Sequence, residues 1–156
     1  MRLRLTKRAD YAVRACLVLA SASEVPLPSR RIAERMAIPD RFLPQVLADL
    51  SRAGIVEGTV GKGGGYVLRR DARELTLLEI IESVEGPARS EQCVLEDRPC
   101  DAGHACALHP VWYAAQSAFI RVLETTTIDR IAAQATRPTH LVGAPAGPSA
   151  PERIPA

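Results

Sequence analysis

The sequence has few aromatic residues and no long apolar run. Phe, Trp and Tyr make up 4% of its 156 residues, whereas apolar residues as a whole make up 47%. Alanine and aliphatic side chains therefore supply most of any core, which favours a mainly helical fold. No segment approaches the ~20 consecutive apolar residues of a membrane span. A chain of this length suits one domain, or a small domain with an appended element and a tail.

Motifs of the common enzyme classes are also missing. The glycine-rich segment around Lys62 lacks the spacing of a phosphate-binding Walker loop, and the chain has no C-x-x-C pair. The apolar stretch 15–22 follows charged Asp10 and Arg14 and lacks a convincing cleavage site for a signal peptide. We therefore expect a cytoplasmic protein that is not an enzyme and does not enter a membrane.

The two halves of the chain carry opposite charge. Residues 1–70 contain 13 Lys and Arg against 6 Asp and Glu, a net charge of +7. Residues 71–156 contain 7 against 12, a net charge of −5. A basic front half suits a polyanion such as DNA, because each neutralised phosphate releases counterions. A solvated basic face is the alternative explanation.

The first part of the chain has the pattern of a winged helix-turn-helix. Apolar spacing predicts a helix over 6–22, and Cys16 lies on its buried stripe. Ser29 is a good N-cap for a short helix over 30–37, and a third helix is expected over 41–54 with Pro44 in its first turn. A glycine-rich β-hairpin follows over residues 55–70. The fold class is therefore mainly α with a small hairpin wing, and the wing is placed to touch the DNA backbone.

This arrangement predicts the residues that contact DNA. Arg41 and Gln45 are presented by the second short helix of the pair, where they can reach base edges in the major groove. The candidate DNA-binding residues are Ser29, Arg30, Arg41, Gln45, Lys62, Gly63 and Gly64.

Two further helices and a tail complete the expected organisation. Thr76 and Glu79 form a capping box that opens a helix ending near Glu85. A long helix over 110–124 has an apolar stripe that needs a partner, and we expect this partner to be a second subunit as well as the first helix. The stripe comprises Val111, Trp112, Ala115, Ala118, Phe119, Val122 and Leu123. Thr127 caps a short last helix, and the proline-rich residues 135–156 are expected to be disordered.

Between these helices lies the sequence CVLEDRPCDAGHACALH, residues 93–109. Six residues separate Cys93 from Cys100, five separate Cys100 from Cys106, and two separate Cys106 from His109. Only the last gap suits the chelating pairs of structural zinc. Wide gaps let three soft thiolates wrap around an iron–sulfur cluster. Structural zinc, a metal-free thiol switch, a thiol oxidoreductase and an inert loop are the alternatives.

These motifs together resemble the bacterial Rrf-type winged-helix regulators, which include IscR-, NsrR-, RirA- and RsrR-like members. The resemblance covers about residues 1–134. It rests on LTKRADYAVRA, on LSRAGIV leading into GKGGGYVL, on LTLLEIIESVEG, and on the cysteine loop that ends in CALHPVW. It implies a homodimeric transcription regulator, a repressor, that senses nitric oxide, redox stress or iron status through a 2Fe–2S or 4Fe–4S cluster and binds palindromic operators in double-stranded DNA.

The resemblance also implies ligands for that cluster. Cys93, Cys100 and Cys106 match the ligating cysteines of the family, and His109 matches a histidine of IscR-like members. Asp10 matches a first-helix carboxylate that NsrR-like and RsrR-like members supply from the opposite subunit. The fourth ligand is therefore His109 or Asp10; the other roles open to them are capping at a helix start and an ion pair with Arg14.

The chain departs from the family pattern at three points. Its first cysteine gap is one residue longer than in typical IscR-like or NsrR-like members. Pro44 stands where IscR-like members read bases with a glutamate, and Val60 replaces a common arginine of the wing. The expected division is residues 1–86 for DNA binding, 87–109 for the cluster, 110–134 for dimerisation and 135–156 for the tail.

Overall fold

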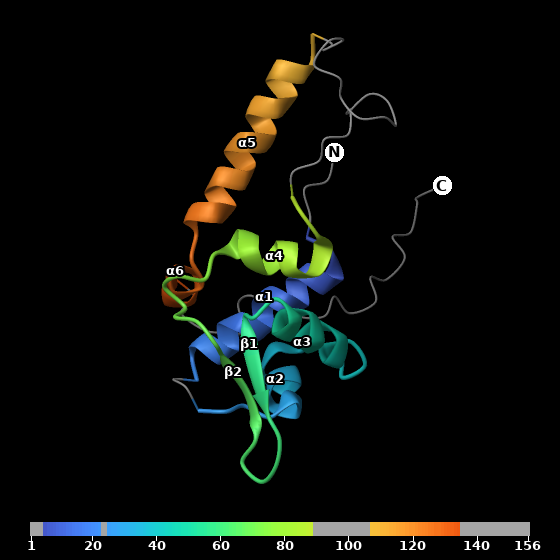
Figure 1. The fold of residues 1–156 in the computed structure, drawn as a ribbon, viewed down its shortest axis with the longest axis vertical. Coiled ribbons are helices and arrows are strands. Elements are labelled where there is room, and N and C mark those ends of the chain that lie inside the picture. The colour runs from blue at the N-terminus through green and yellow to red at the C-terminus, as the bar shows by residue number, and fades with distance from the viewer. Residues whose placement is uncertain (1–4, 23–24, 89–106, 135–156) are drawn as a thin grey trace, which may run out of the picture.

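The computed structural model describes residues 5–22, 25–88 and 107–134. Within these ranges the chain forms six helices and one antiparallel hairpin (Figure 1). The elements are α1 (Lys7–Ala20), α2 (Ser29–Met36), α3 (Leu43–Arg52), β1 (Val56–Thr59), β2 (Gly65–Leu68), α4 (Leu77–Glu85), α5 (His109–Thr125) and α6 (Ile128–Gln134). The predicted fold class, mainly α with a hairpin wing, is confirmed. None of these helices is long and apolar enough to cross a membrane.

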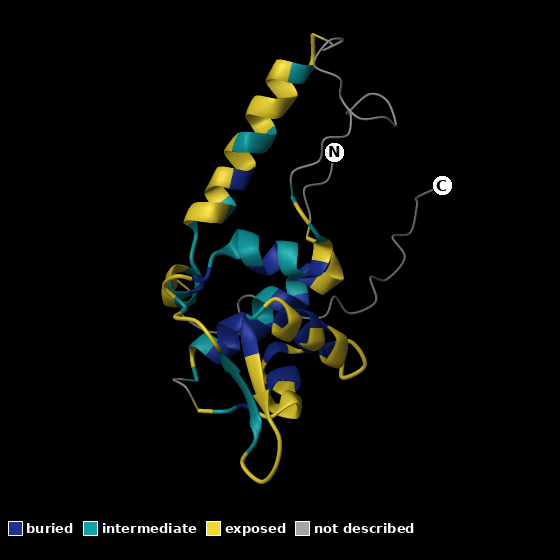
Figure 2. Ribbon diagram, viewed as in Figure 1, coloured by how far each residue is buried: buried dark blue, intermediate teal, exposed yellow. Residues whose placement is uncertain are grey.

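Helix α1 lies at the centre of the core. The side chain of Thr6 caps it by accepting a hydrogen bond from the N–H of Ala9 at 3.2 Å. Its buried residues include several small ones, and Ala12, Ala15 and Cys16 are fully buried. Such side chains let other elements approach closely, and α2, α3, α4, α6 and β2 all contact α1 (Figure 2). The prediction that Cys16 is a core residue is confirmed.

The helix-turn-helix is formed by α2 and α3. Ala37 adopts the left-handed conformation, with φ of 50°, and ends α2 by donating a hydrogen bond to the carbonyl of Ala33. Pro44 lies in the first turn of α3, as predicted, where its missing N–H leaves no bond unmade. Arg41 precedes α3 instead of opening it, because residues 40–42 form a turn.

The predicted N-cap of α2 is wrong by one residue. Ser29 is the first residue of the helix, and Pro28 occupies the cap position in an extended conformation. The carbonyl of Pro28 accepts hydrogen bonds from the N–H groups of Arg31 and Ile32 at 2.8 and 3.2 Å. A backbone carbonyl therefore begins the helix, and no side-chain cap takes part.

The wing contains a contact that the sequence did not predict. Strands β1 and β2 pair from Val56 opposite Leu68 to Thr59 opposite Gly65. Leu27, from the segment before α2, then pairs with Tyr66 through two hydrogen bonds of 2.9 and 3.0 Å. The segment before α2 therefore borders the hairpin and fixes its direction relative to the helix-turn-helix.

The capping box of α4 is confirmed. The N–H of Thr76 donates to the Glu79 carboxylate at 2.9 Å, and the N–H of Glu79 donates to the Thr76 hydroxyl at 3.2 Å. The same end of α4 is joined to the end of α5, because the N–H of Leu77 donates to the carbonyl of Thr126 at 2.8 Å. Thr127 lies directly before α6, and its hydroxyl donates to the Asp129 carboxylate.

Helix α5 projects from the core (Figure 1). It packs mainly on α4, whereas the short helix α6 that follows it is among the elements that pack on α1. The expected packing of the long helix on the first helix is therefore at most a minor contact within one subunit. Ile120 is its buried residue, although the predicted stripe did not include it. Helix α5 begins at its outer end, far from the wing (Figure 1).

We predict that Gly65→Ala destabilises the protein. An added Cβ would lie 2.5 Å from the carbonyl carbon of Leu27, inside the contact that borders the hairpin. The free energy of unfolding should fall by about 1–3 kcal/mol, a typical effect of overpacking. Urea unfolding followed by circular dichroism measures it, with the exposed Val60→Ala as the control. Equal midpoints for the two variants would show that this contact adds no stability.

Candidate nucleic-acid interface and cluster site

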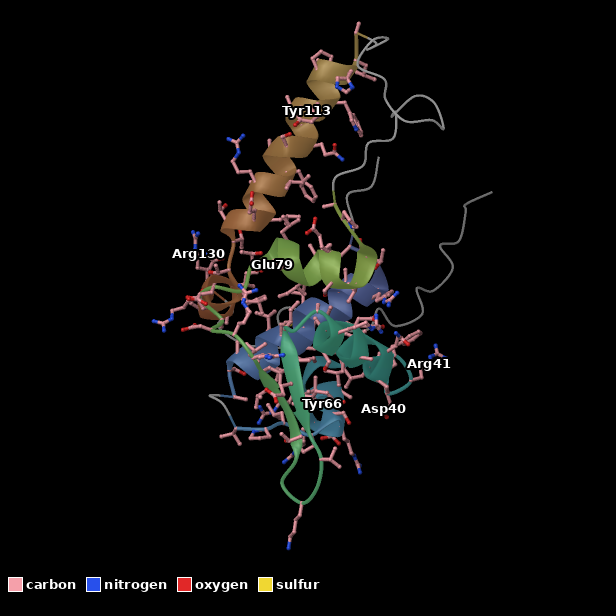
Figure 3. The ribbon with its side chains drawn as sticks, in the orientation of Figure 1. Asp40, Arg41, Tyr66, Glu79, Tyr113 and Arg130 are labelled. Carbon is pink, nitrogen blue, oxygen red and sulfur yellow. The ribbon has the colours of Figure 1, made fainter. Side chains whose placement is uncertain are left out.

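The predicted DNA-binding residues of the helix-turn-helix lie on exposed surface. Ser29, Arg30, Arg41 and Gln45 are all exposed. Arg30 donates to Glu34 at 3.0 Å, one turn further along α2. Figure 3 shows Arg41 beside Asp40 in the turn that leads into α3. The Arg41 guanidinium lies 4.7 Å from the centre of the Phe42 ring, so the ring supports it from one side.

The side chain of Gln45, the second candidate for reading bases, forms a hydrogen bond within α3. Its amide nitrogen Nε2 donates a hydrogen bond to Oδ1 of Asp49, one turn further along α3, at 3.1 Å. Gln45 itself is exposed, whereas Asp49 is 2% exposed. The readout residue is therefore tied to a buried carboxylate.

The Asp49 carboxylate connects α3 to α1. Arg8 of α1 donates to Oδ2 through both Nε, at 2.9 Å, and Nη2. Arg52 pairs with Oδ1 at 3.0 Å. Burial by itself would raise the pKa of Asp49, but the hydrogen bonds from Arg8 and Gln45 outweigh it and hold the pKa below its usual value. The carboxylate is therefore charged at neutral pH.

The backbone of the wing tip requires glycine at several positions. Gly61 and Gly63 have positive φ values of 112° and 88°, which turn the chain at the tip. An added Cβ on Gly64 would lie 2.3 Å from the carbonyl oxygen of Thr59. Lys62 and Gly63 are exposed and Gly64 is half-buried, so Lys62 places a positive charge at the exposed tip.

The candidate cluster ligands are only partly within the described residues. Cys93, Cys100 and Cys106 lie outside them, as does His104. His109 is the first residue of α5, and its ring stacks on that of Tyr113 with 6.1 Å between centroids. Figure 3 labels Tyr113 near the outer end of α5. Ligand-type residues do not gather in groups of three or more anywhere in the part of the chain that the structure describes.

Asp10 lies in the first turn of α1 and pairs with Arg14. The guanidinium Nε of Arg14 donates to Oδ1 of Asp10 at 2.8 Å, and the Asp10 side chain is 27% exposed. Arg14 also donates to the carbonyl of Met36, the last residue of α2, at 3.3 Å. The ion pair that was the alternative role of Asp10 is therefore present. Helix α1, which carries Asp10, and the outer end of α5 lie in different parts of one subunit (Figure 1).

Cys16, the remaining cysteine of the chain, lies on α1. Its side chain is fully buried in the core of α1. Burial in an apolar environment raises the pKa of its thiol to about 12. The thiolate is the metal-binding form, so Cys16 is poorly suited to hold a metal or a cluster.

The apolar residues of α5 lie on an exposed surface. Val111, Phe119 and Val122 are 66%, 47% and 63% exposed, and Trp112 is 38% exposed. Leu123 is half-buried against the core. Contiguous exposed apolar residues of this kind mark an interaction surface in a folded protein.

Comparison with known proteins identifies the family. A family model described as an iron-dependent transcriptional regulator, Rrf2, matches residues 5–134. The chain belongs to the Rrf2 family. The repressor NsrR of Streptomyces coelicolor is 32% identical to this Rrf2-family chain over 148 residues, which cover 94% of the chain and 93% of the relative. IscR of Photorhabdus laumondii is 36% identical over 111 residues, or 70% of the chain and 67% of the relative.

Solved structures agree with this assignment. CymR, the global cysteine regulator of B. subtilis, matches with a TM-score of 0.73 at 28% identity and covers 85% of the chain and 98% of its own. IscR of T. potens matches with a TM-score of 0.70 at 27% identity, and the match covers 85% of this chain and 88% of the IscR chain. The Rrf-type resemblance drawn from the sequence is confirmed, and the chain is a transcriptional regulator of this family.

Sequence reasoning missed the residues that hold Gln45. Asp49 follows Gln45 by four residues, which is a local pattern for a side-chain contact on a helix. Arg8 lies 41 residues before Asp49, and no sequence pattern joins the two.

Proposed function

We propose that this Rrf2-family chain is a homodimeric repressor that binds palindromic promoter DNA and senses nitric oxide, redox stress or iron status through an iron–sulfur cluster. The observation that carries the proposal is the position of the three-cysteine sequence, directly before the apolar helix α5 of a winged-helix regulator. Residues 1–86 bind DNA, residues 87–109 hold the cluster and residues 110–134 form the dimer. The iron-dependent family description and the relatives named IscR and NsrR support it.

DNA binding rests on exposed basic and amide side chains. Arg41 suits guanine, and the Gln45 amide suits adenine, in the major groove. Lys62 at the tip of the wing offers a positive charge to the phosphate backbone. Ser29 and Arg30 at the start of α2, and the N–H groups of Gly63 and Gly64, supply further contacts that position the protein on the duplex.

The donor set fits an iron–sulfur cluster. Cys93, Cys100 and Cys106 provide three thiolates, and the fourth ligand is His109 or Asp10. His109 is half-exposed and only two residues separate it from Cys106. Asp10 is partly exposed on α1, and the family resemblance implies that it would be supplied by the opposite subunit. When bound, a cluster of 2Fe–2S or 4Fe–4S type supplies a group that reacts with oxidants and nitric oxide. Regulation then requires the cluster to bind more tightly to one DNA-binding geometry of the protein than to another.

The exposed apolar face of α5 supports the homodimer. Helix α5 projects from the core with Phe119 and Val122 uncovered, so a second copy of α5 is a matching partner. Two-fold symmetric pairing of one surface with itself is the commonest form of oligomer. The same pairing would bring the loop before α5 of one subunit towards α1 of the other.

A metal-free thiol switch is the second candidate. The structural likeness to CymR, which is described as a global cysteine regulator and not as an iron-dependent one, favours it. A structural zinc in the same loop is a further form of this alternative. Visible absorbance separates the cluster from these two alternatives, because zinc and free thiols are both colourless.

The DNA contacts predict two classes of variant. Arg41→Ala and Gln45→Ala should each weaken binding to the cognate operator by about 1–3 kcal/mol and relax its specificity, because each removes a base contact. Lys62→Ala should weaken binding to all sequences alike and lower the salt-dependence slope by about one, because it removes a phosphate contact. Electrophoretic mobility shifts at several salt concentrations measure both. Unchanged operator affinity in the first two variants would contradict their placement.

The cluster predicts which cysteines are needed for colour. Replacing Cys93, Cys100 or Cys106 by Ala should remove or destabilise the chromophore of the anaerobically purified protein, since each supplies one thiolate. Cys16→Ala should preserve the chromophore, because Cys16 is buried in the core. Absorbance, electron paramagnetic resonance and native mass spectrometry measure the outcome and the nuclearity.

Matched variants identify the fourth ligand in the same spectra. A change in His109→Ala alone assigns His109, and a change in Asp10→Ala alone assigns Asp10. Identical spectra and cluster lifetimes in both would leave solvent or a small thiol as the fourth ligand. A coloured Cys100→Ala protein together with a colourless Cys16→Ala protein would overturn the whole ligand assignment.

The dimer predicts an effect of charge on α5. Replacing both Phe119 and Val122 by Glu should convert the dimer to a monomer, because two carboxylates would face their copies in an apolar interface. Sedimentation velocity measures the mass. Val25→Glu is the matched control, since Val25 is 65% exposed and lies outside α5. A dimeric double variant would show that another surface joins the subunits.

A further inference from the structure

Among the described residues, Asp49 is the charged residue that is buried in the core. Its two oxygens have separate partners. Oδ2 accepts both hydrogen bonds from Arg8 of α1, and Oδ1 accepts from Gln45 at 3.1 Å and pairs with Arg52 at 3.0 Å. The carboxylate is therefore held from both sides. The bonds from Arg8 to Oδ2 fix the position of Oδ1, which Gln45 contacts.

We infer that Asp49 is a positioning residue that determines which base Gln45 prefers, by fixing the orientation of the Gln45 amide. An ionised carboxylate only accepts hydrogen bonds, so the amide must turn Nε2 towards Asp49. This leaves one N–H and the carbonyl oxygen Oε1 of Gln45 for a base edge. The inference rests on the proposed function, because it requires Gln45 to read DNA.

The fixed amide matches adenine in preference to guanine. Adenine presents an acceptor and a donor in the major groove, which pair with an N–H and a carbonyl oxygen. Guanine presents two acceptors, which pair with two donors. A glutamine that could turn freely would offer either pattern. Asp49 removes this freedom, because in the reversed orientation the amide oxygen of Gln45 would face the carboxylate, and two acceptors cannot form a hydrogen bond.

Arg8 makes the arrangement rigid. It lies on α1, so its bond to Asp49 ties the reading residue on α3 to the most deeply packed helix of the core. Arg52 alone would hold the carboxylate less firmly, since its side chain is 71% exposed and it lies on α3 itself. A reading side chain that is ordered before it meets DNA loses less conformational freedom on binding.

Asp49→Asn tests the inference through base preference. The asparagine has one acceptor oxygen, and when this oxygen accepts from Arg8, its NH₂ group faces Gln45. That NH₂ group donates to the Gln45 amide oxygen and so favours the reversed orientation of the Gln45 amide. Sequences are selected from a random duplex library by the full-length protein purified anaerobically, and base preferences are read at every position. The preference of adenine over guanine at the pair that Gln45 reads should fall at least about fivefold, within the range of one bidentate contact. Preferences elsewhere and the salt slope should stay unchanged.

A double variant separates positioning from a structural role. In a Gln45→Ala background, Asp49→Asn should change no base preference, because Asp49 acts only through Gln45. Asp71→Asn is the matched control, since Asp71 makes the same kind of bonds to Arg73 outside the helix-turn-helix. Arg8→Met is the second route, because it frees Oδ2 while Arg52 still pairs with the carboxylate; it should lower the same preference even where Asp49→Asn fails to fold.

The outcomes distinguish the inference from the proposed function. If Gln45→Ala leaves every base preference unchanged, Gln45 does not read DNA, and both fall together. If Gln45→Ala abolishes the adenine preference but Asp49→Asn and Arg8→Met keep it, the inference alone is overturned. A loss of preference at all positions alike, or an equal effect of Asp49→Asn in the Gln45→Ala background, would make Asp49 a structural residue only.

Discussion

Five elements of the fold pack around α1, and small side chains on part of its buried face allow this close approach. Ala9, Ala12, Ala15 and Cys16 are fully buried, and they let α2, α3, α4, α6 and β2 all approach the same helix. Larger residues on that face would push these elements apart, since a packed core tolerates added volume poorly. The angle between the helix-turn-helix and the wing therefore depends on α1. So does the position of α4, which carries α5.

Local patterns gave the parts of the fold that depend on neighbouring residues. The Thr76 capping box, the position of Pro44 in the first turn of α3, and the glycine-rich hairpin all follow from residues within a few positions of one another. The buried stripe that contains Cys16 follows from helical spacing alone. The error at Ser29 was also local: a side-chain cap and the carbonyl of Pro28 compete for the same helix start, and the sequence favours neither.

Contacts between distant segments could not be predicted. The pairing of Leu27 with Tyr66 and the bond from Arg8 to Asp49 join residues about 40 positions apart, and no spacing rule links them. Packing of α5 mainly on α4 follows from the bonds near Leu77 that tie the end of α5 to the start of α4. The three cysteines proposed as ligands lie outside the described residues, and sequence spacing and the family support their assignment.

Helix α1 is also where the proposed cluster and the proposed DNA readout meet. Asp10 pairs with Arg14, and Arg14 donates to the carbonyl of Met36 at the end of α2. Arg8, two residues before Asp10, holds Asp49 of α3. Both helices of the DNA-binding unit are thus bonded to polar side chains in the first two turns of α1, whose apolar residues are buried in the core. A cluster in the partner subunit that drew Asp10 away from Arg14 would leave that arginine with the Met36 carbonyl. Such a change would act on the helix-turn-helix through the bond from Arg14 to Met36.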